Sequence, residues 1–486
     1  MAARTQKGTG CHEGNAGWGS GAPARDFFLA GAAVGAGRAA DLAGEGGTAA
    51  GAGSGGAGGA ALAGNALWAV LGNVFYAAGR FLIVVLLTRG FASAQVGQVL
   101  YGLAVVTPLG FLINLELRSV YVTDPRGWAG AGHCLGVRLA SNVLLAAVLA
   151  GLCGLNYRTW GGHKVAIILL VGLVRMAESW ADVYLGVLQK HERMKNWAVS
   201  QAIKTVLVLA WAAALARWVS EIAWFLAGWL AVTAGVAWAY DRRQAGRWAD
   251  VRPRWDGAVS GRLVRSGLPL GVFVTLASCN QYVGQYFIQP ALGDAAVAHF
   301  AALLNVVSGL AAVQNGINQA VLARLARYYV EGARRFRRLL GAVLGVSWLG
   351  AGLLVGAVWW KGAAILRVLY GQEYVQFAPQ FTIVAMAGWL VLTSMTLGDA
   401  VVACQRYKSR MIAVGIGVAV NGLLSGLLVG HYGLYGPAWA VVASGGMISL
   451  YCAGVLRSAG RSRRAAGRSG AHVEVLAQAG GQRTEG

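Results

Sequence analysis

Long apolar runs, separated by short polar connections, dominate the chain from Asn65 onward. A helix needs about 20 apolar residues to cross the roughly 30 Å of hydrocarbon in a bilayer, and only helices or closed barrels satisfy the backbone there. Strands of a barrel would alternate apolar and polar residues, whereas these runs are continuous. The pattern therefore predicts an all-α polytopic membrane protein of about twelve helices. The expected spans are residues 65–88, 96–116, 131–154, 165–187, 198–217, 221–240, 264–288, 296–322, 339–359, 379–403, 411–430 and 435–456.

Basic residues gather in every second connection between these runs. Positively charged loops stay on the cytoplasmic side of a membrane, so the alternation predicts an even number of spans with both termini in the cytoplasm. The connections expected there carry Arg118 and Arg126; Lys190, Arg193 and Lys195; Arg242, Arg243, Arg247, Arg252 and Arg254; Arg327, Arg334, Arg335, Arg337 and Arg338; and Arg406, Lys408 and Arg410. The remaining connections are poorer in basic residues, with Arg89, Arg158, Lys164, Arg217, Lys361 and Arg367 in or near them.

The longest of the basic connections, residues 241–263, lies midway along the membrane region. It divides the region into lobes at 65–240 and 264–456, each with six expected helices. Two such lobes around a central cavity allow one half to rock against the other. Residues 1–64, rich in Gly and Ala, and the basic tail 457–486 have few large apolar side chains, so we expect disorder there. An alternative for residues 1–64 is that the expressed chain starts downstream of them.

The composition excludes several other classes of protein. Hydrophobic residues make up 57% of the 486 residues and charged residues 12%, which leaves too little polar surface for a soluble domain. The net charge of +22 could suit nucleic acid, but its distribution in short clusters between spans indicates anionic membrane lipids instead. The six cysteines form no Cys-x-x-Cys pair, and no nucleotide-binding motif is present. We therefore expect no metal, cofactor or nucleic acid.

Charged residues inside the spans are candidates for function, because each is costly in lipid without a partner or water. Arg80 lies deep in the first span, where a guanidinium can bind phosphate through two parallel hydrogen bonds; a structural ion pair or a helix-end anchor is the alternative. Arg175, Glu178 and Asp182 share one face of the fourth span. If Arg175 pairs with one carboxylate, the other could bind a proton or Na⁺, although a static ion-pair network is equally consistent. Asp399, near the end of the tenth span, is expected to pair with nearby basic residues.

Polar residues at two further places are weaker candidates. Glu116 and Arg118 end the second span, where anchoring at the membrane surface and local pairing are expected ahead of substrate contact. Asn280, Gln281 and Gln285 lie in the seventh span. Uncharged polar groups there indicate either hydrogen bonds between helices or the wall of a hydrated cavity that could bind sugar hydroxyls.

Three stretches of the sequence have a specific resemblance. ESWADVYLGVLQKHERMKNWAVS at 178–200, YGQEY at 370–374 and GLYGPAWAVV at 433–442 are similar to segments of Wzx-type polysaccharide exporters, which belong to the multidrug/oligosaccharidyl-lipid/polysaccharide (MOP) superfamily. The similarity extends in order over about residues 65–456. It implies two six-helix lobes of the MATE type and a flippase that moves an undecaprenyl-diphosphate-linked oligosaccharide across the bacterial inner membrane. Exopolysaccharide, capsule or O-antigen (lipopolysaccharide) synthesis would be the pathway, with polysaccharide polymerase machinery as a candidate partner.

The same resemblance implies which residues would contact the substrate. Cationic residues facing the cavity would meet the diphosphate, and Arg80, with Arg118 or Arg175, are the matching positions. The chain departs from the family in the seventh span, where Gly284, Gln285 and Tyr286 stand in place of Pro-Arg-Tyr. The resemblance therefore places no diphosphate contact at that point.

Two other functions remain open at the level of sequence. An ion-coupled drug or metabolite exporter of the same superfamily would be expected to have an acidic aromatic pocket, whereas Arg80 is positive. A membrane glycosyltransferase or polysaccharide polymerase would need a sizeable loop bearing carboxylates for metal or acid–base chemistry. The external connections are short and Asp-x-Asp is absent, so a transporter rather than an enzyme is expected.

Overall fold

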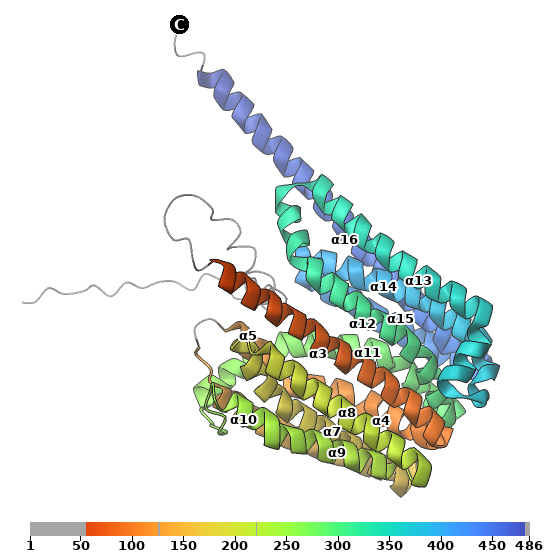
Figure 1. The fold of residues 1–486 in the computed structure, drawn as a ribbon. Coiled ribbons are helices and arrows are strands. Elements are labelled where there is room, and N and C mark those ends of the chain that lie inside the picture. The colour runs from red at the N-terminus through yellow and green to blue at the C-terminus, as the bar shows by residue number, and fades with distance from the viewer. Residues whose placement is uncertain (1–54, 125–126, 220, 482–486) are drawn as a thin grey trace, which may run out of the picture.

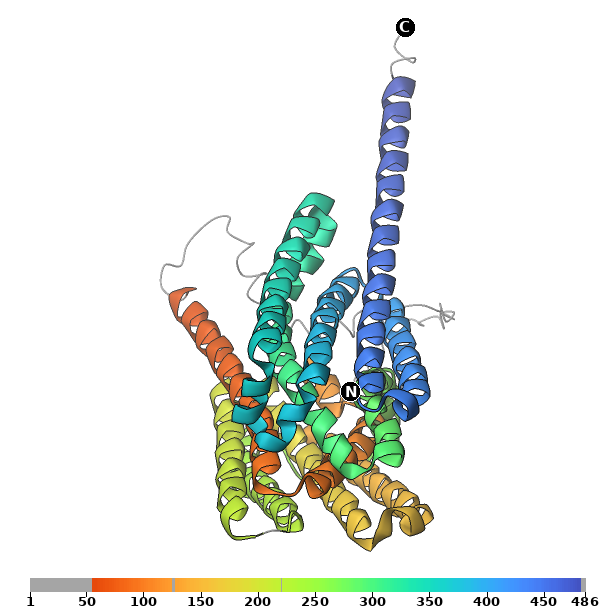
Figure 2. The same cartoon turned by 90° about the vertical axis from the view of Figure 1, so that its right-hand side faces the viewer.

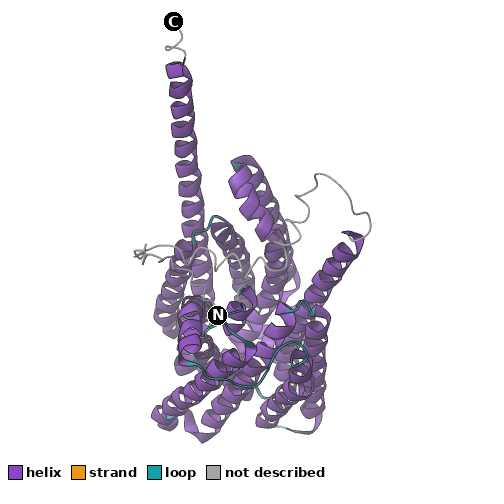
Figure 3. Ribbon diagram, turned by 90° about the vertical axis from the view of Figure 1, so that its left-hand side faces the viewer, coloured by secondary structure: helices purple, strands orange, loops and turns teal. Residues whose placement is uncertain are grey.

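The computed structural model describes residues 55–481 apart from 125–126 and 220, and only the backbone of 55–63, 66, 217 and 462–481. The expected disorder of residues 1–54 and 482–486 lies outside the described residues. The described part of the chain is helical throughout, without strands (Figure 3). Its helices are α3 (Gly55–Gly90), α4 (Ser93–Asn114), α5 (Leu117–Thr123), α6 (Ala131–Leu155), α7 (Tyr157–Lys190), α8 (Met194–Trp218), α9 (Ala223–Val236), η1 (Ala237–Asp241), α10 (Arg242–Ala245), α11 (Gly257–Leu292), α12 (Asp294–Glu331), α13 (Ala333–Tyr370), η2 (Gln372–Phe377), α14 (Ala378–Ala403), α15 (Tyr407–Tyr432) and α16 (Tyr435–Gly481).

Successive long helices run in alternate directions, so that their ends gather at two ends of one bundle (Figure 1). We call them the terminal end, where α3 begins and α16 leaves the bundle, and the far end. Following the chain order, we refer to helices α3–α9 as the N-terminal lobe, in which α3 packs along α8, and to helices α11–α16 as the C-terminal lobe. The lobes meet where α4 packs against α11 and α12, and where α3 crosses α12. Figure 2 shows the terminal-end portions of α3, α13 and α16 standing apart from one another.

The prediction of an all-α membrane bundle is confirmed. Eleven helical segments within the described residues are long and apolar enough to cross a membrane. The remaining expected span corresponds to α7, which has 34 residues but carries charged side chains within its apolar run. The charges that make α7 less apolar are those singled out in the sequence.

Three helices extend into segments that were expected to be disordered or to connect the lobes. Residues 55–64 continue α3 and residues 457–481 continue α16, where disorder was expected. Extending an existing helix costs less than nucleating a new one, and neither extension contains proline. The connection between the lobes is likewise shorter than 241–263: α11 begins at Gly257, because the Asp256 carboxylate caps it by accepting from the N–H groups of Ala258 and Val259 at 2.9 and 3.0 Å.

The second expected span is interrupted near the terminal end. After Asn114 the chain turns through Leu115 and Glu116, both with positive φ (59° and 46°), and α5 follows. Such a break frees backbone carbonyls that lipid cannot satisfy, and Arg138 donates to the Asn114 carbonyl at 2.9 Å. The break packs closely against α11, since a Cβ on Gly267 would lie 2.4 Å from the Leu115 carbonyl oxygen.

Proline creates a second link between the lobes. Pro108 lies inside α4 and has no N–H, so the carbonyl of Ala104 one turn earlier has no partner in its own helix. The Tyr286 hydroxyl of α11 donates to that carbonyl at 2.5 Å. A helix irregularity readable in the sequence thus becomes a hydrogen bond between the two halves.

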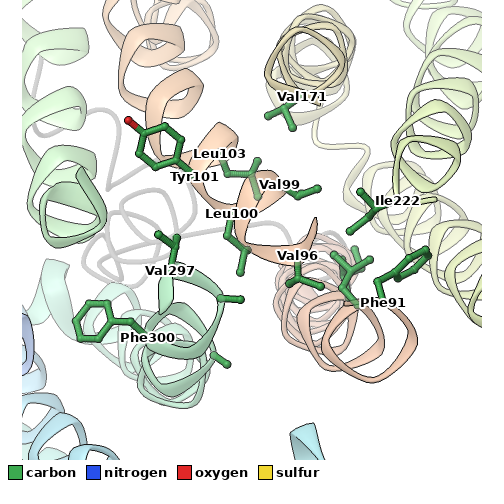
Figure 4. Packing of buried hydrophobic residues seen from close by; sticks show 14 of the residues in the cluster. Phe91, Val96, Val99, Leu100, Tyr101, Leu103, Val171, Ile222, Val297 and Phe300 are labelled. Atoms are coloured by element: carbon green, nitrogen blue, oxygen red, sulfur yellow. The ribbon is translucent and has the colours of Figure 1, made fainter. Parts of the chain in front are cut away.

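The largest apolar cluster lies toward the far end, where α4 faces α12 and α7 (Figure 4). Val96 and Val99 of α4 and Val297 of α12 are fully buried in it, and Phe300 is nearly so. Because lipid is as apolar as these side chains, close packing rather than the hydrophobic effect stabilises the contact within a membrane.

Candidate functional site

Arg80 lies within α3, and its hydrogen bond and ring contact are with a residue of the same helix. Its Nη1 donates to the Tyr76 hydroxyl one turn earlier at 3.2 Å, and its guanidinium lies 5.8 Å from the centre of that ring. Glu178 of α7 and Tyr282 of α11 act on Arg80 electrostatically without a hydrogen bond to it. The neighbouring Phe81 connects this part of α3 to the C-terminal lobe, since its carbonyl accepts from Asn305 of α12 at 3.2 Å.

Arg175 and Glu178 form the second part of the same cluster. Arg175 Nη1 donates to Glu178 Oε2 at 2.6 Å, and Nη2 donates to Thr107 Oγ1 of α4 at 3.1 Å. The Arg175 Nε is buried and has no hydrogen-bond partner among the described residues. With Arg80, the central cluster holds two guanidinium groups and one carboxylate, and so a net charge of +1.

Arg118 and Asp182 form a separate group about one turn along α7, nearer the terminal end. Arg118 donates to Asp182 Oδ1 at 2.9 Å and to Gln189 Oε1 at 2.9 and 2.7 Å. The sequence argument left one of the two α7 carboxylates without a partner. That expectation needs correction: Arg175 pairs with Glu178 and Arg118 pairs with Asp182. A contact missing from the sequence argument, between α5 and α7, supplies the second cation.

The three polar candidates of α11 face different surroundings. Asn280 binds within the C-terminal lobe, where its carbonyl accepts from Asn421 at 2.9 Å and its side chain accepts from Ser444 at 3.0 Å. Gln285 is 4% exposed, and its Oε1 has no hydrogen-bond partner among the described residues, whereas Gln281 is exposed. Asn280 thus links helices, while Gln285 offers an unused acceptor.

Asp399 lies in a buried polar network of the C-terminal lobe. It accepts from Asn318 Nδ2 at 2.8 Å and interacts electrostatically with Arg410, in agreement with the expected basic neighbour. Gln314 and Thr396 complete the network, with Gln314 donating to Asn318 at 2.7 Å and to Thr396 at 3.1 Å. These side chains satisfy one another.

Sequence reasoning missed several charged residues that the structure buries. Lys204 of α8 binds Asp241 at 2.6 Å, and Asp241 is fully buried; Arg138 of α6 is 2% exposed. Both basic residues lie inside apolar runs, so the argument applied to Arg80 would have found them. Lys164 and Asp294 also pair, at 2.5 Å, but each lies at the edge of an apolar run and nothing in the sequence joins them.

Comparisons with known proteins agree with this architecture. No family model matches the sequence. A capsular polysaccharide biosynthesis protein of Staphylococcus aureus, CapF, is 22% identical over 392 residues, covering 78% of this chain and 95% of the relative.

Solved structures are similar at the level of fold. The inward-facing structure of a multidrug resistance MATE family transporter of the MOP superfamily matches 82% of this chain and 95% of its own, with a TM-score of 0.60 and 12% identity. The lipid II flippase MurJ in an inward closed conformation matches 82% of this chain and 87% of its own, with a TM-score of 0.57 and 12% identity. The chain is therefore a multi-pass membrane protein that shares its fold with MATE family transporters and with MurJ, and it is similar over most of its length to a capsular polysaccharide biosynthesis protein.

Proposed function

We propose that this protein is a flippase that moves an undecaprenyl-diphosphate-linked oligosaccharide across the bacterial inner membrane for exopolysaccharide, capsule or O-antigen synthesis. The observation that carries the proposal is the group of Arg80, Arg175 and Glu178 within the membrane-spanning helices, which has a net positive charge. The similarity to CapF, a capsular polysaccharide biosynthesis protein, supports the pathway.

The cluster has the chemistry that a diphosphate requires. A guanidinium offers several N–H donors in a fixed plane that matches phosphate oxygens. Among the described residues Arg80 donates to a neutral phenol, and Arg175 keeps one buried N–H without a partner. Both can therefore donate further hydrogen bonds to an anion. A cationic drug would be repelled by the same net charge, which disfavours the drug-exporter alternative.

The direction of loading follows from the two ends of the bundle. The basic connections lie at the terminal end, which we assign to the cytoplasm together with both termini. Their charge would attract anionic headgroups, both of bulk lipid and of the substrate. Loading at the terminal end and release at the far end require the lobes to rock about their shared helices. Polysaccharide polymerase machinery would receive the product.

Glu178 is the better candidate for coupling to an ion gradient. It binds Arg175 and acts electrostatically on Arg80, so protonating it would raise the net charge of the cluster that faces an anion. Asp182 is held by Arg118 at 2.9 Å, and would have to exchange that partner to bind a proton or Na⁺. Arg118 would then contact substrate near the terminal end.

Reconstitution tests the proposal. Purified protein in liposomes should expose a fluorescent lipid-diphosphate oligosaccharide to an external lectin or reductant faster than empty liposomes do. A deletion strain should lose its surface polymer and accumulate the lipid-linked precursor. The proposal fails if neither the purified protein moves the lipid nor the deletion affects polymer export.

A further inference from the structure

The far end contains a buried ion pair that joins the two lobes. Lys164 of α7 and Asp294, the first residue of α12, approach to 2.5 Å between Nζ and Oδ1. The Lys164 side chain is 3% exposed and that of Asp294 17% exposed. The ammonium also lies 4.5 Å from the centre of the Tyr101 ring of α4. A buried charge that loses its partner is strongly unfavourable, so this contact favours the closed far end as long as the pair is intact.

The path of α7 sets the position of this lysine. Gly161 has φ of 73°, a left-handed conformation that glycine adopts without strain, and it kinks α7 ahead of Lys164. His163, the neighbouring residue, binds Gln98 at 3.0 Å and Glu221 at 2.7 Å within its own lobe. The first turn of the long part of α7 is thus held in the N-terminal lobe while Lys164 reaches the other.

A glycine makes the approach of the lobes possible. A Cβ on Gly97 of α4 would lie 1.7 Å from the Asp294 carbonyl oxygen, and so could not be accommodated without moving the backbone of α12. The apolar side chains beside it, including Val96, Leu100 and Val297, close the space around the contact (Figure 4). The ion pair therefore lies beside closely packed apolar side chains, with no space for a larger residue at position 97.

Two further polar contacts join the lobes at the same end. Arg89, next to the end of α3, donates to the last carbonyls of α13, those of Arg367, Val368 and Leu369. Ser93 of α4 donates to Glu373 of η2 at 2.5 Å, and Glu373 also binds His299 at 2.8 Å. These side chains are more exposed than that of Lys164, so their contacts hold the two lobes together less strongly.

We propose that the Lys164–Asp294 pair, seated against Gly97, is the lock that holds the far end closed and that must break before the lobes can part there. The inference rests on the proposed transport only in that release requires this parting. Nothing in it depends on which substrate is carried. Opening would separate Lys164 from Asp294 and expose the α4 face that contains Leu100.

Labelling of a buried cysteine tests the lock without any substrate. In a chain whose six native cysteines are replaced, Leu100→Cys is introduced and the protein is placed in nanodiscs, where both ends are accessible. Lys164→Met and Asp294→Asn should each raise the rate of maleimide labelling by at least about tenfold. Exchanging the two residues (Lys164→Asp with Asp294→Lys) should restore slow labelling. Gly97→Val should raise the labelling rate.

Matched controls separate the lock from a general loss of stability. Lys204→Met breaks a buried pair of similar length, 2.6 Å, inside one lobe, and Gly110→Ala adds a Cβ to α4 with its nearest neighbour at 3.9 Å; both should leave labelling slow. Leu155→Cys, 87% exposed, reports equal labelling in every folded variant. The lock is refuted if Lys164→Met and Gly97→Val label slowly, or if Lys204→Met labels as fast as they do. Failure of lipid transport with these labelling results intact would refute the proposed substrate and leave the lock standing.

Discussion

The two ends of the bundle are held together in different ways. At the far end, polar contacts run between the lobes, as in the Lys164–Asp294 pair and the Arg89 contacts with α13. At the terminal end, pairs such as Arg118–Asp182 and Lys204–Asp241 lie within one lobe. There the lobes touch mainly along α11, where its glycines lie against Leu115.

This difference shows which contacts would have to change for one lobe to rock against the other. Contacts within a lobe can persist while the lobes rock, because their partners move together. Contacts between the lobes cannot persist, because their partners move apart. In this structure the far end is therefore closed by contacts between the lobes, whereas the terminal-end portions of α3, α13 and α16 stand apart (Figure 2).

Substitution of Arg80 in the central cluster should have the largest effect on transport. Arg80→Ala should lower polymer export in a complementation assay by roughly 10- to 100-fold, since a hydrogen bond to a charged group contributes about 1.5–3 kcal/mol. Arg80→Lys should retain part of the activity, because it keeps the charge but not the fork of donors. Membrane levels of each variant serve as the control, and full export by both would remove Arg80 from the substrate site.

Tethering the far end should be the next largest effect. Ser93→Cys with Glu373→Cys, joined by a short bismaleimide, links α4 to η2 across the lobes and should slow transport. His163→Cys with Glu221→Cys joins two residues of one lobe that lie equally close, and tethering it should leave transport unchanged. Equal inhibition by both tethers would contradict the distinction between the ends.

The Arg118–Asp182 pair at the terminal end should matter for stability more than for closure. Because both side chains are partly exposed (23% and 33%), Asp182→Asn should lower the free energy of unfolding by about 1 kcal/mol. A double-mutant cycle with Arg118→Gln, read by thermal unfolding in detergent, measures the coupling. Loss of Na⁺- or proton-dependent transport without loss of stability would instead favour Asp182 as a coupling site.

The smallest expected effect concerns the cap of α11, which lies in the connection between the lobes. Two backbone N–H groups bind the Asp256 carboxylate and hold its pKa below the usual value. The cap therefore stabilises the helix above the unfolded pKa of about 3.9 and is lost as the pH falls through the lower folded value. Asp256→Asn should lower the melting temperature slightly at pH 7 and not at pH 3. The same loss at both pH values would show that the carboxylate charge does not contribute.

The sequence predicted the helices far better than their contacts. Each of the twelve expected spans coincides with a helix, and eleven of these helices are apolar enough to cross a membrane, because length and hydropathy are local properties. The break at Leu115 and Glu116 was missed, since neither residue is a usual helix breaker and packing against the α11 glycines stabilises it there.

In the candidate site, too, the sequence predicted local relations between residues but not contacts between distant ones. Arg175 and Glu178 were placed on one face by helical periodicity, and the structure pairs them at 2.6 Å. Asp182 was left without a partner because Arg118 lies 64 residues away in the chain. Pairing across such distances depends on how the helices cross.

The sequence by itself determined that this protein spans a membrane and which charged side chains lie within it, because transfer of a helix into lipid depends on composition and spacing. The tertiary structure decided which charges from distant parts of the chain meet: Arg118 with Asp182 near the terminal end, and Lys164 with Asp294 at the far end. Interactions between charges depend on distance in space, which helix packing sets. The close approach at Gly97 also depends on the tertiary structure, because the absence of a Cβ matters only where another helix occupies that space.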